Sequence, residues 1–307
     1  MKFSKSLKKQ SFLFLFLLLI ATLLPVQGKG VSLKLSFGPH YIQKGDINNW
    51  IESLNTLWSE YKDSYGGSVS GQFENLRYKP SIEGELRINL ISGLALNLAV
   101  SYMSGKKEGT INFEQEGVQE VSHFLMNEVK AIPLKFGLSY TYPLPKNFNI
   151  SFSLGRYIIF VQYTTQENYE NPFTAGGKNY SYWSKKNNKF RSESLGYYSS
   201  IGGEYNLTDF LAVGIELEKV WSKVDGFKGP YSFEEFKSWQ EGDDQKYLEE
   251  GKASLYYFET NDNPLNKYYI ELSGEKDKPD DLNLRTLRQG ELNFSGFSLK
   301  IGFRFKF

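Results

Sequence analysis

The stretch that decides the fold is the C-terminal segment FSLKIGFRFKF, residues 297–307. Every odd position in it is large and apolar, and every even position is small or charged. Successive side chains of a β-strand point to opposite faces, so this segment predicts a strand with one apolar and one polar face. The apolar face carries Leu299, Ile301, Phe303, Phe305 and Phe307.

The same period of two recurs along most of the chain. It predicts eight strands, at 31–37, 82–90, 94–102, 132–142, 150–154, 195–205, 211–217 and 297–307. The strand at 195–205 is the weakest of them, because it is rich in Gly, Ser and Tyr. Little of the alternation fits a helix, which would need a period of 3.6 residues.

The connections between these strands alternate in length. Short turns are expected at 91–93, 143–148 and 206–210, and long loops at 39–80, 104–130, 164–194 and 222–290. This is the plan of an all-β, eight-stranded antiparallel up-and-down transmembrane β-barrel, with short periplasmic turns and long extracellular loops. A ten-stranded barrel is the alternative within this class.

A soluble sandwich or lipocalin-like barrel would also alternate apolar and polar residues. In such a protein the polar face would meet water and be strongly charged. Here the polar face is mostly Gly, Ala, Ser and Asn, which suits a narrow lumen, and aromatic residues gather at the strand ends, as membrane girdles require. These two features favour the membrane barrel.

The first residues predict an export signal. Four lysines between positions 2 and 9 precede an uncharged run at 11–26 that is dominated by Leu and Phe, and Gly28 offers a small residue for cleavage. This three-part plan is that of a secretory signal peptide. We therefore expect residues 1–28 to be a signal peptide and residues 29–307 to form the outer-membrane barrel domain.

Composition narrows the chemistry. The chain has 36 Lys+Arg and 35 Asp+Glu, so no bulk charge would recruit nucleic acid. It has no cysteine, which excludes thiol catalysis and cysteine-ligated metals, and its two histidines are His40 and His123. Serines and acids are plentiful, so a general base would be the limiting group for hydrolysis. Both histidines are expected to be structural, and we expect no cofactor and no metal.

Two segments carry a family resemblance. The alternating strand that ends in Phe307 resembles the assembly signal of Gram-negative outer-membrane proteins. The segment 195–217, with Gly202-Gly203-Glu204-Tyr205 leading into the next strand, resembles the small eight-stranded barrels of the opacity-protein, OmpX and OmpW-like families. The resemblance implies location in the cell outer membrane, contact with its lipid and lipopolysaccharide, and folding by the barrel assembly machinery. It carries over no functional residue.

Charged residues of the strands are assigned to the lumen, because a charge facing lipid costs about 2–4 kcal/mol at mid-membrane for Lys or Arg. Five acids and five bases are placed there: Lys34, Glu83, Glu85, Arg87, Lys135, Glu204, Glu216, Glu218, Lys300 and Arg304. An eight-stranded interior is just wide enough for side chains to fill it. A salt-bridged plug is therefore favoured over a proton or ion pathway.

The predicted loops contain some local order. Asp46 is expected to cap a helix over 47–61, which would lie either in the membrane interface or against the barrel rim. The pattern at 232–235 predicts a short helix that includes Phe236 and Trp239. A hairpin is expected between 254–258 and 267–272. The acidic segment 262–271 lacks the glycine of a calcium loop, so no metal site is expected there.

Together these features predict a non-enzymatic surface protein whose barrel displays long loops for adhesion, ligand interaction or envelope integrity. The alternative is a narrow, porin-like channel for ions or small apolar molecules.

Overall fold

The computed structural model describes residues 30–116, 119–175, 178–238, 244–261, 265, 268–279 and 284–307. The predicted signal peptide lies outside the described residues. No helix among the described residues is long and apolar enough to cross a membrane.

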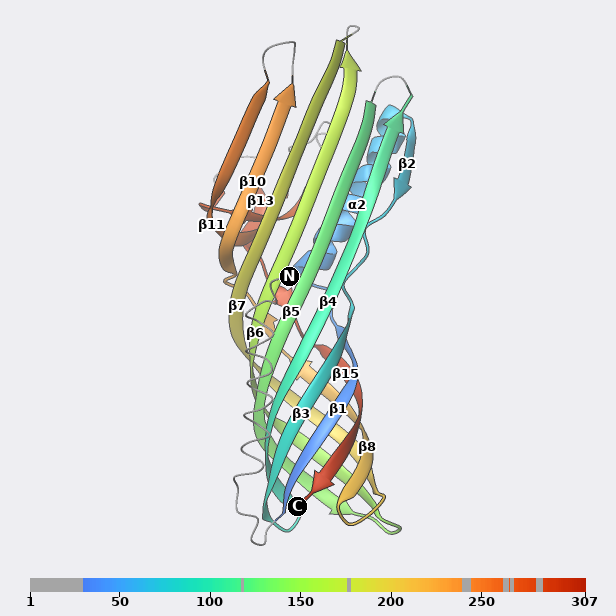
Figure 1. The fold of residues 1–307 in the computed structure, drawn as a ribbon, viewed down its shortest axis with the longest axis vertical. Helices are drawn as coiled ribbons and strands as arrows, with labels where there is room; N and C mark the ends of the chain where they lie inside the picture. Colours follow the sequence, from blue (N-terminus) through green and yellow to red (C-terminus); the bar gives the residue numbers. More distant parts are fainter. Residues whose placement is uncertain are drawn as a thin grey trace, which may run out of the picture.

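Eight antiparallel strands form a closed ring (Figure 1). In order around the ring they are β1 (Val31–Ile42), β3 (Tyr78–Ile91), β4 (Leu94–Gln115), β5 (Gln119–Pro143), β6 (Phe148–Ala175), β7 (Lys178–Asn206), β8 (Leu211–Trp221) and β15 (Gly296–Lys306). The C-terminal strand closes the ring, with Leu35 opposite Phe303 on one side and Val213 opposite Phe303 on the other. The predicted eight-stranded barrel is confirmed.

The alternation of the sequence becomes the two faces of the barrel wall. In β15, Leu299, Ile301 and Phe303 are 48 %, 47 % and 44 % exposed on the outside. Lys300 and Arg304 occupy alternate positions and are each 3 % exposed. Exposed aromatic residues border this apolar belt at both ends. Those at the periplasmic end are Tyr140, Tyr142, Phe148, Phe210 and Phe307, and those at the other end are Tyr41, Tyr78, Tyr197, Trp221 and Phe297.

Four strands continue far above the belt. β6 has 28 residues and β7 has 29, whereas a tilted membrane-crossing strand needs about 9–11. The expected long loops at 104–130 and 164–194 are therefore wrong: both regions are extended hairpins. The cause is visible in β5, where Val121, His123 and Leu125 are buried at alternate positions, so the strand period simply continues beyond the membrane.

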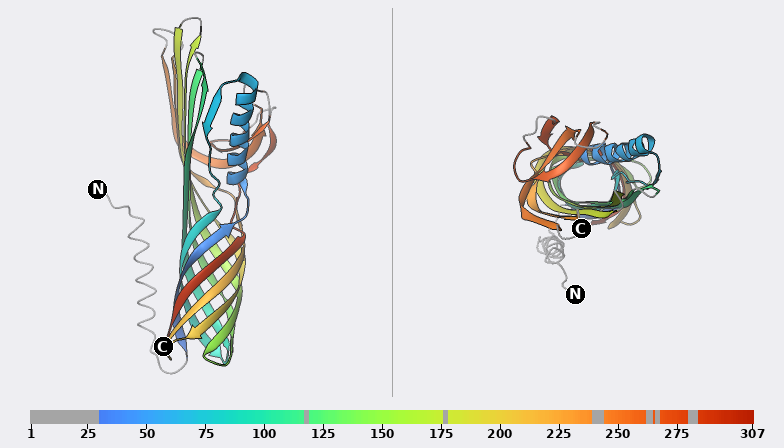
Figure 2. Two further views of the ribbon diagram at one scale, coloured as in Figure 1. Left: turned by 90° about the vertical axis from the view of Figure 1, so that its right-hand side faces the viewer. Right: turned by 90° about the horizontal axis from the view of Figure 1, so that it is seen from above.

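Further strands widen this projection on one side (Figure 2). β10 (Lys228–Ser238) pairs with the upper part of β7, β11 (Gln245–Thr260) pairs with β10, and β12 (Tyr269–Glu275) and β13 (Arg285–Gln289) pair with β11. On the other side, β2 (Ser68–Gly71) pairs with β4. We call residues 104–130 and 164–194, together with β2 and β10–β13, the upper wall.

The loop predictions have mixed outcomes. The hairpin is confirmed, with Tyr257 opposite Leu272, but it extends the upper wall and leaves the ring at eight strands, so the ten-stranded alternative is wrong. The short helix at 232–235 is also wrong, because this segment is part of β10 and pairs on both edges. Ladder hydrogen bonds from two neighbours outweigh a local capping pattern. Trp239 lies outside the described residues.

The helix α2 (Asp46–Tyr65) stands upright beside the upper wall (Figure 2). It buries Trp50, Ile51, Leu54 and Trp58, which follow a helical spacing. Packing against the rim is therefore correct and the interfacial position is wrong. Asp46 does not cap the helix; its carboxylate accepts hydrogen bonds from Arg288 at 2.6 and 2.7 Å and from the Glu291 amide at 2.7 Å, since this tertiary ion pair competes for the same oxygens.

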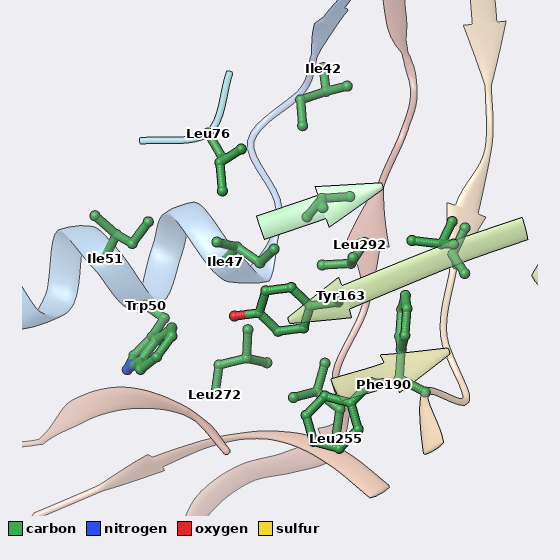
Figure 3. Close-up of a cluster of buried hydrophobic side chains, with 14 of the residues drawn as sticks. Ile42, Ile47, Trp50, Ile51, Leu76, Tyr163, Phe190, Leu255, Leu272 and Leu292 are labelled. Carbon is green, nitrogen blue, oxygen red and sulfur yellow. The ribbon is translucent and has the colours of Figure 1, made fainter. Parts of the chain in front are cut away.

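Buried apolar side chains fill the space where the barrel meets the upper wall (Figure 3). They come from the start of α2, from residues 73–76 and from the short pair β9 (Lys223–Val224) and β14 (Leu292–Asn293). β6, β7, β11 and β12 contribute Tyr163, Phe190, Leu255 and Leu272. Val224, Phe227 and Phe294 are at most 1 % exposed. We call this cluster the apolar cap, because it lies over the extracellular end of the lumen.

Candidate functional site

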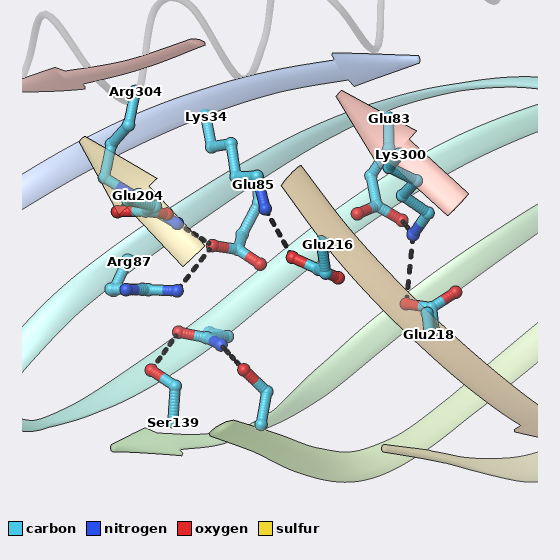
Figure 4. Close-up of polar contacts among 12 residues, drawn as sticks. Lys34, Glu83, Glu85, Arg87, Ser139, Glu204, Glu216, Glu218, Lys300 and Arg304 are labelled. Carbon is cyan, nitrogen blue, oxygen red and sulfur yellow. Dashed lines mark hydrogen bonds and ion pairs between the residues drawn. The ribbon is translucent and has the colours of Figure 1, made fainter. Parts of the chain in front are cut away.

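All ten charged residues assigned to the lumen are buried there, between 3 % and 7 % exposed. Figure 4 labels all of them except Lys135. Their position follows from the strand period, which turns each of them away from lipid. The structure brings them together in two groups. The upper group contains Lys34, Lys135, Lys300, Glu83, Glu216 and Glu218, and the lower group contains Glu85, Arg87, Glu204 and Arg304.

The upper group is built around two carboxylates and two ammonium groups. Lys135 lies 2.5 Å from Glu83 and 2.6 Å from Glu218, and Lys300 lies 2.9 and 3.0 Å from the same two acids. Ser101 donates a further hydrogen bond to Glu83 at 2.6 Å. Each of these four groups therefore has two oppositely charged partners, which offset the cost of burying its charge.

The ion pair of Glu216 does not follow the strand register. It faces Lys300 in the strand register, yet its ion pair is with Lys34, across β15 on β1. Lys300 instead reaches inward to Glu83 and Glu218. In a narrow lumen, long side chains extend across the interior, so strand neighbours do not dictate the pairs.

The lower group surrounds an arginine. Arg304 donates to Glu204 at 2.9 Å and to Glu85 at 3.0 Å, and Arg87 lies 3.5 Å from Glu85. Below it, the lumen opens into a polar cavity of about 760 Å³ at the periplasmic mouth, lined by Arg87, Glu204, Arg304 and Lys306 among others.

The carboxylates of Glu83, Glu216 and Glu218 have oxygens within 4.8 Å of one another, which is a spacing that a cation could use. Three lysine ammonium groups already contact these oxygens. With five acids against five bases, the lumen supplies its own counter-charges, and these three carboxylates are part of an ion-pair network.

A second site lies in the upper wall, in segments that were expected to be long loops with a helix and a hairpin. A cavity of about 390 Å³ separates one face of α2 from the inner face of β5, β6, β7, β10 and β12. We call it the upper pocket. It is lined by Trp50, Leu54, Leu57, Trp58, Tyr61, His123, Glu167, Tyr169, Tyr182, Ser184, Lys186, Phe233, Tyr269 and Glu271. Alternation within 119–130 and 164–194 was the signal that would have revealed these strands.

His123 is held at the edge of this pocket by both ring nitrogens. The indole N–H of Trp58 donates to Nδ1 at 3.2 Å, and Nε2 lies 2.8 Å from Oε1 of Glu167. An indole nitrogen is a donor only, so Nδ1 accepts, and Nε2 carries the proton that is donated to Glu167.

The pocket also contains a charged triad, formed by Lys186, Glu167 and Glu271. Lys186 donates to Ser273 at 2.9 Å and lies 3.7 Å from Glu271. Burial opposes ionisation of Glu167, but the hydrogen bond from His123, the electrostatic attraction of His123 and the charge of Lys186 outweigh it and hold the pKa of Glu167 below the usual range. For Glu271 burial dominates and raises the pKa. Burial also disfavours the Lys186 ammonium, but Glu271 and Glu167 outweigh it and raise its pKa.

His40 is placed differently. It is buried at the top of β1, where Nε2 lies 3.3 Å from the carbonyl oxygen of Phe294 in the apolar cap. It has no part in the upper pocket. The two histidines are thus separate, and each is engaged by neighbouring groups.

Comparison with known proteins finds structural similarity only. No family model matches the sequence, and no curated protein is significantly similar to it. The chain is similar to the outer membrane protein OprG from Pseudomonas aeruginosa, with a TM-score of 0.40 at 8 % identity over 92 % of this chain and 97 % of that chain. It is similar to Neisserial surface protein A, with a TM-score of 0.30 at 8 % identity over 92 % and 100 %. It is also similar to the outer membrane protease OmpT from Escherichia coli, with a TM-score of 0.31 at 9 % identity over 92 % and 99 %.

These identities transfer no function and no site residue. The assignment rests on the molecule itself: a closed sheet exposes a belt of aliphatic side chains between two aromatic girdles and keeps its charges inside. Water would not stabilise such an exterior, whereas lipid does, and a closed sheet is the form in which strands cross a bilayer. The chain is therefore an eight-stranded β-barrel protein of the bacterial outer membrane.

Proposed function

We propose that this protein is a non-enzymatic outer-membrane barrel that seals its own lumen and uses the upper wall to bind a ligand at the cell surface. The observation that carries the proposal is the contrast between the two ends of the molecule. The lumen is filled by ion pairs under an apolar cap, whereas the upper pocket is open and lined by side chains of several elements.

The height of the upper wall supports a role at the surface. Residues 161–175 of β6 lie above the belt, and at about 3.3 Å per residue they extend for roughly 50 Å along the strand. Such a projection would carry the upper pocket beyond the lipid headgroups and into the lipopolysaccharide layer. A protein that served only to conduct would not need this structure.

The geometry of the pocket supports a binding role without catalysis. Both nitrogens of His123 are engaged, and the Ser184 hydroxyl is hydrogen-bonded to Tyr182. A nucleophile and its base within hydrogen-bond reach are what acyl transfer requires. An ester-deacylation assay that compares wild type with His123→Ala tests this part; any turnover lost in the variant would contradict it.

Because the lumen is sealed, we expect the barrel not to conduct ions. Wild-type protein in planar bilayers is expected to give no unitary conductance steps, because a permeating ion would have to displace buried ion pairs and then cross the apolar cap. Protease digestion of the upper wall in matching proteoliposomes shows that the barrel is inserted and serves as the control. Steady conductance of the wild type would instead establish the narrow-channel alternative.

The barrel assembly machinery is the partner that we propose for the C-terminal strand. Phe307 is 59 % exposed, so its side chain buries little in the finished barrel. Deleting it is expected to reduce the amount of protein in the outer membrane while leaving the urea midpoint of detergent-refolded protein unchanged. Phe210→Ser, which alters a residue of similar exposure in the same girdle, is the control and should leave the yield unchanged. Equal yields for the deletion and the wild type would refute the assignment.

A further inference from the structure

We propose that the upper pocket binds an organic cation with an alkylated ammonium group, which the aromatic side chains and the carboxylates of Glu167 and Glu271 hold together. This inference rests on the proposed function and names the ligand class of the same site.

The aromatic side chains of the pocket favour a cation. The pocket is lined by seven aromatic side chains from α2, β6, β7, β10 and β12: Trp50, Trp58, Tyr61, Tyr169, Tyr182, Phe233 and Tyr269. Trp58 stacks on Tyr169 with centroids 6.4 Å apart, and Tyr169 meets Tyr182 at 5.8 Å. A cation within about 6 Å of such a ring is attracted by its quadrupole.

The molecule already uses one of these rings in this way. The ammonium nitrogen of Lys237 lies 5.7 Å from the ring centroid of Tyr182. An ammonium group therefore fits against the aromatic side of this wall. The other six rings come from α2, β6, β10 and β12, so aromatic side chains of several elements surround the cavity without the ligand.

The charged side chains that line the pocket also favour a cation. Glu167 and Glu271 contribute two carboxylates to the lining, and Lys186 contributes one ammonium group. The carboxylates therefore outnumber the ammonium group. This balance disfavours an anionic ligand, and a neutral sugar would gain nothing from it. A cation is attracted both by the carboxylates and by the faces of the aromatic rings.

The size is consistent with a small ligand. Ligand pockets commonly measure about 300–1,000 Å³, and this one has about 390 Å³. Choline is a suitable probe because a neutral molecule of nearly the same shape, 3,3-dimethyl-1-butanol, exists for comparison. The two differ in charge and hardly in apolar area, so their comparison separates cation recognition from simple hydrophobic binding.

The experiment measures binding of both probes to the full-length mature protein refolded in detergent micelles. Tryptophan fluorescence reports on Trp50 and Trp58, and calorimetry provides the affinity. Choline is expected to bind at least about tenfold more tightly than its neutral analogue, in line with a desolvated cation–π contact. Equal binding of the two, or no binding of choline, would overturn the proposal.

Variants of β7 make the test independent of folding defects. Lys186→Met removes the competing ammonium group and is expected to tighten choline binding about tenfold, a gain that unfolding cannot produce. Lys185→Met is the matched control, because Lys185 is the next residue along β7, points to the opposite face and is exposed. Both variants change the net charge equally, so equal affinities would contradict a direct role of the pocket charge.

Two further variants should weaken binding. Glu271→Gln removes one carboxylate, and Tyr169→Leu removes a ring while keeping an apolar side chain. Tyr180→Leu is the control, because Tyr180 lies on the neighbouring strand β7, stacks on Phe173 and does not line the pocket. If choline binding survives both changes, the cation site is refuted. A conducting wild-type barrel would overturn the proposed function whatever choline does, whereas a silent barrel that ignores choline overturns only the ligand.

Discussion

Replacing Glu83 by leucine is expected to lower the free energy of unfolding of the barrel by about 3–5 kcal/mol. Glu83 accepts contacts from Lys135 at 2.5 Å and Lys300 at 2.9 Å, and all three side chains are at most 6 % exposed. Its removal leaves two ammonium groups to share Glu218. The cost arises because a buried charge that loses its partner keeps its desolvation penalty. Urea unfolding in detergent micelles measures the change.

A surface pair is the control for this experiment. Glu234 and Lys246 lie 2.7 Å apart in the upper wall, with side chains 30 % and 61 % exposed. Glu234→Leu is expected to cost no more than about 1 kcal/mol, because exposed ion pairs are screened and exchange readily with water. If Glu83→Leu proves as mild as Glu234→Leu, the lumen is hydrated and the network does not seal it.

Trp58→Ala is expected to destabilise the packing of α2 on the upper wall by about 3–5 kcal/mol, the usual cost of truncating a buried tryptophan. Trp58 is 5 % exposed, contacts Phe113 and Tyr169, and donates to His123. Hydrogen exchange should show the amides of α2 opening more easily. The transmembrane ring should remain folded, because it is stabilised by its own ladder and by lipid.

Thr56→Ala is the control on the same helix. Thr56 is exposed, and its hydroxyl donates only to a carbonyl oxygen of its own helix, so exchange in α2 should hardly change. The heat-dependent electrophoretic mobility of the barrel reports on the ring in both variants. Loss of that mobility shift in Trp58→Ala would show that the upper wall and the ring fold as one unit.

The membrane-spanning part of the structure was readable from residue order, and Lys300 and Arg304 are the clearest examples. Each lies between two apolar residues of β15, so the period of two alone places it inside. The partners were not readable. Glu216 faces Lys300 in the register but pairs with Lys34, because the choice depends on how long side chains extend across the lumen.

In the upper wall, too, tertiary contacts decide features that the local sequence does not. Ser232 and Glu235 form a capping pattern in isolation, yet β7 and β11 pair with both edges of their segment and make it a strand. Likewise His123, Glu167 and Glu271 are far apart in sequence, and the pairing of β5 with β6 and the position of β12 against α2 bring them to one cavity.

By itself, the sequence determined the strand period, the facing of each side chain and the closure into an eight-stranded membrane barrel, because these depend on residues one or two positions apart and on the two solvents that the faces meet. Only the tertiary structure decided the lumen ion pairs, the strand pairing of β10 and the upper pocket. Those features depend on contacts between segments that are distant in the chain, where several pairings satisfy the local pattern equally well and packing selects one of them.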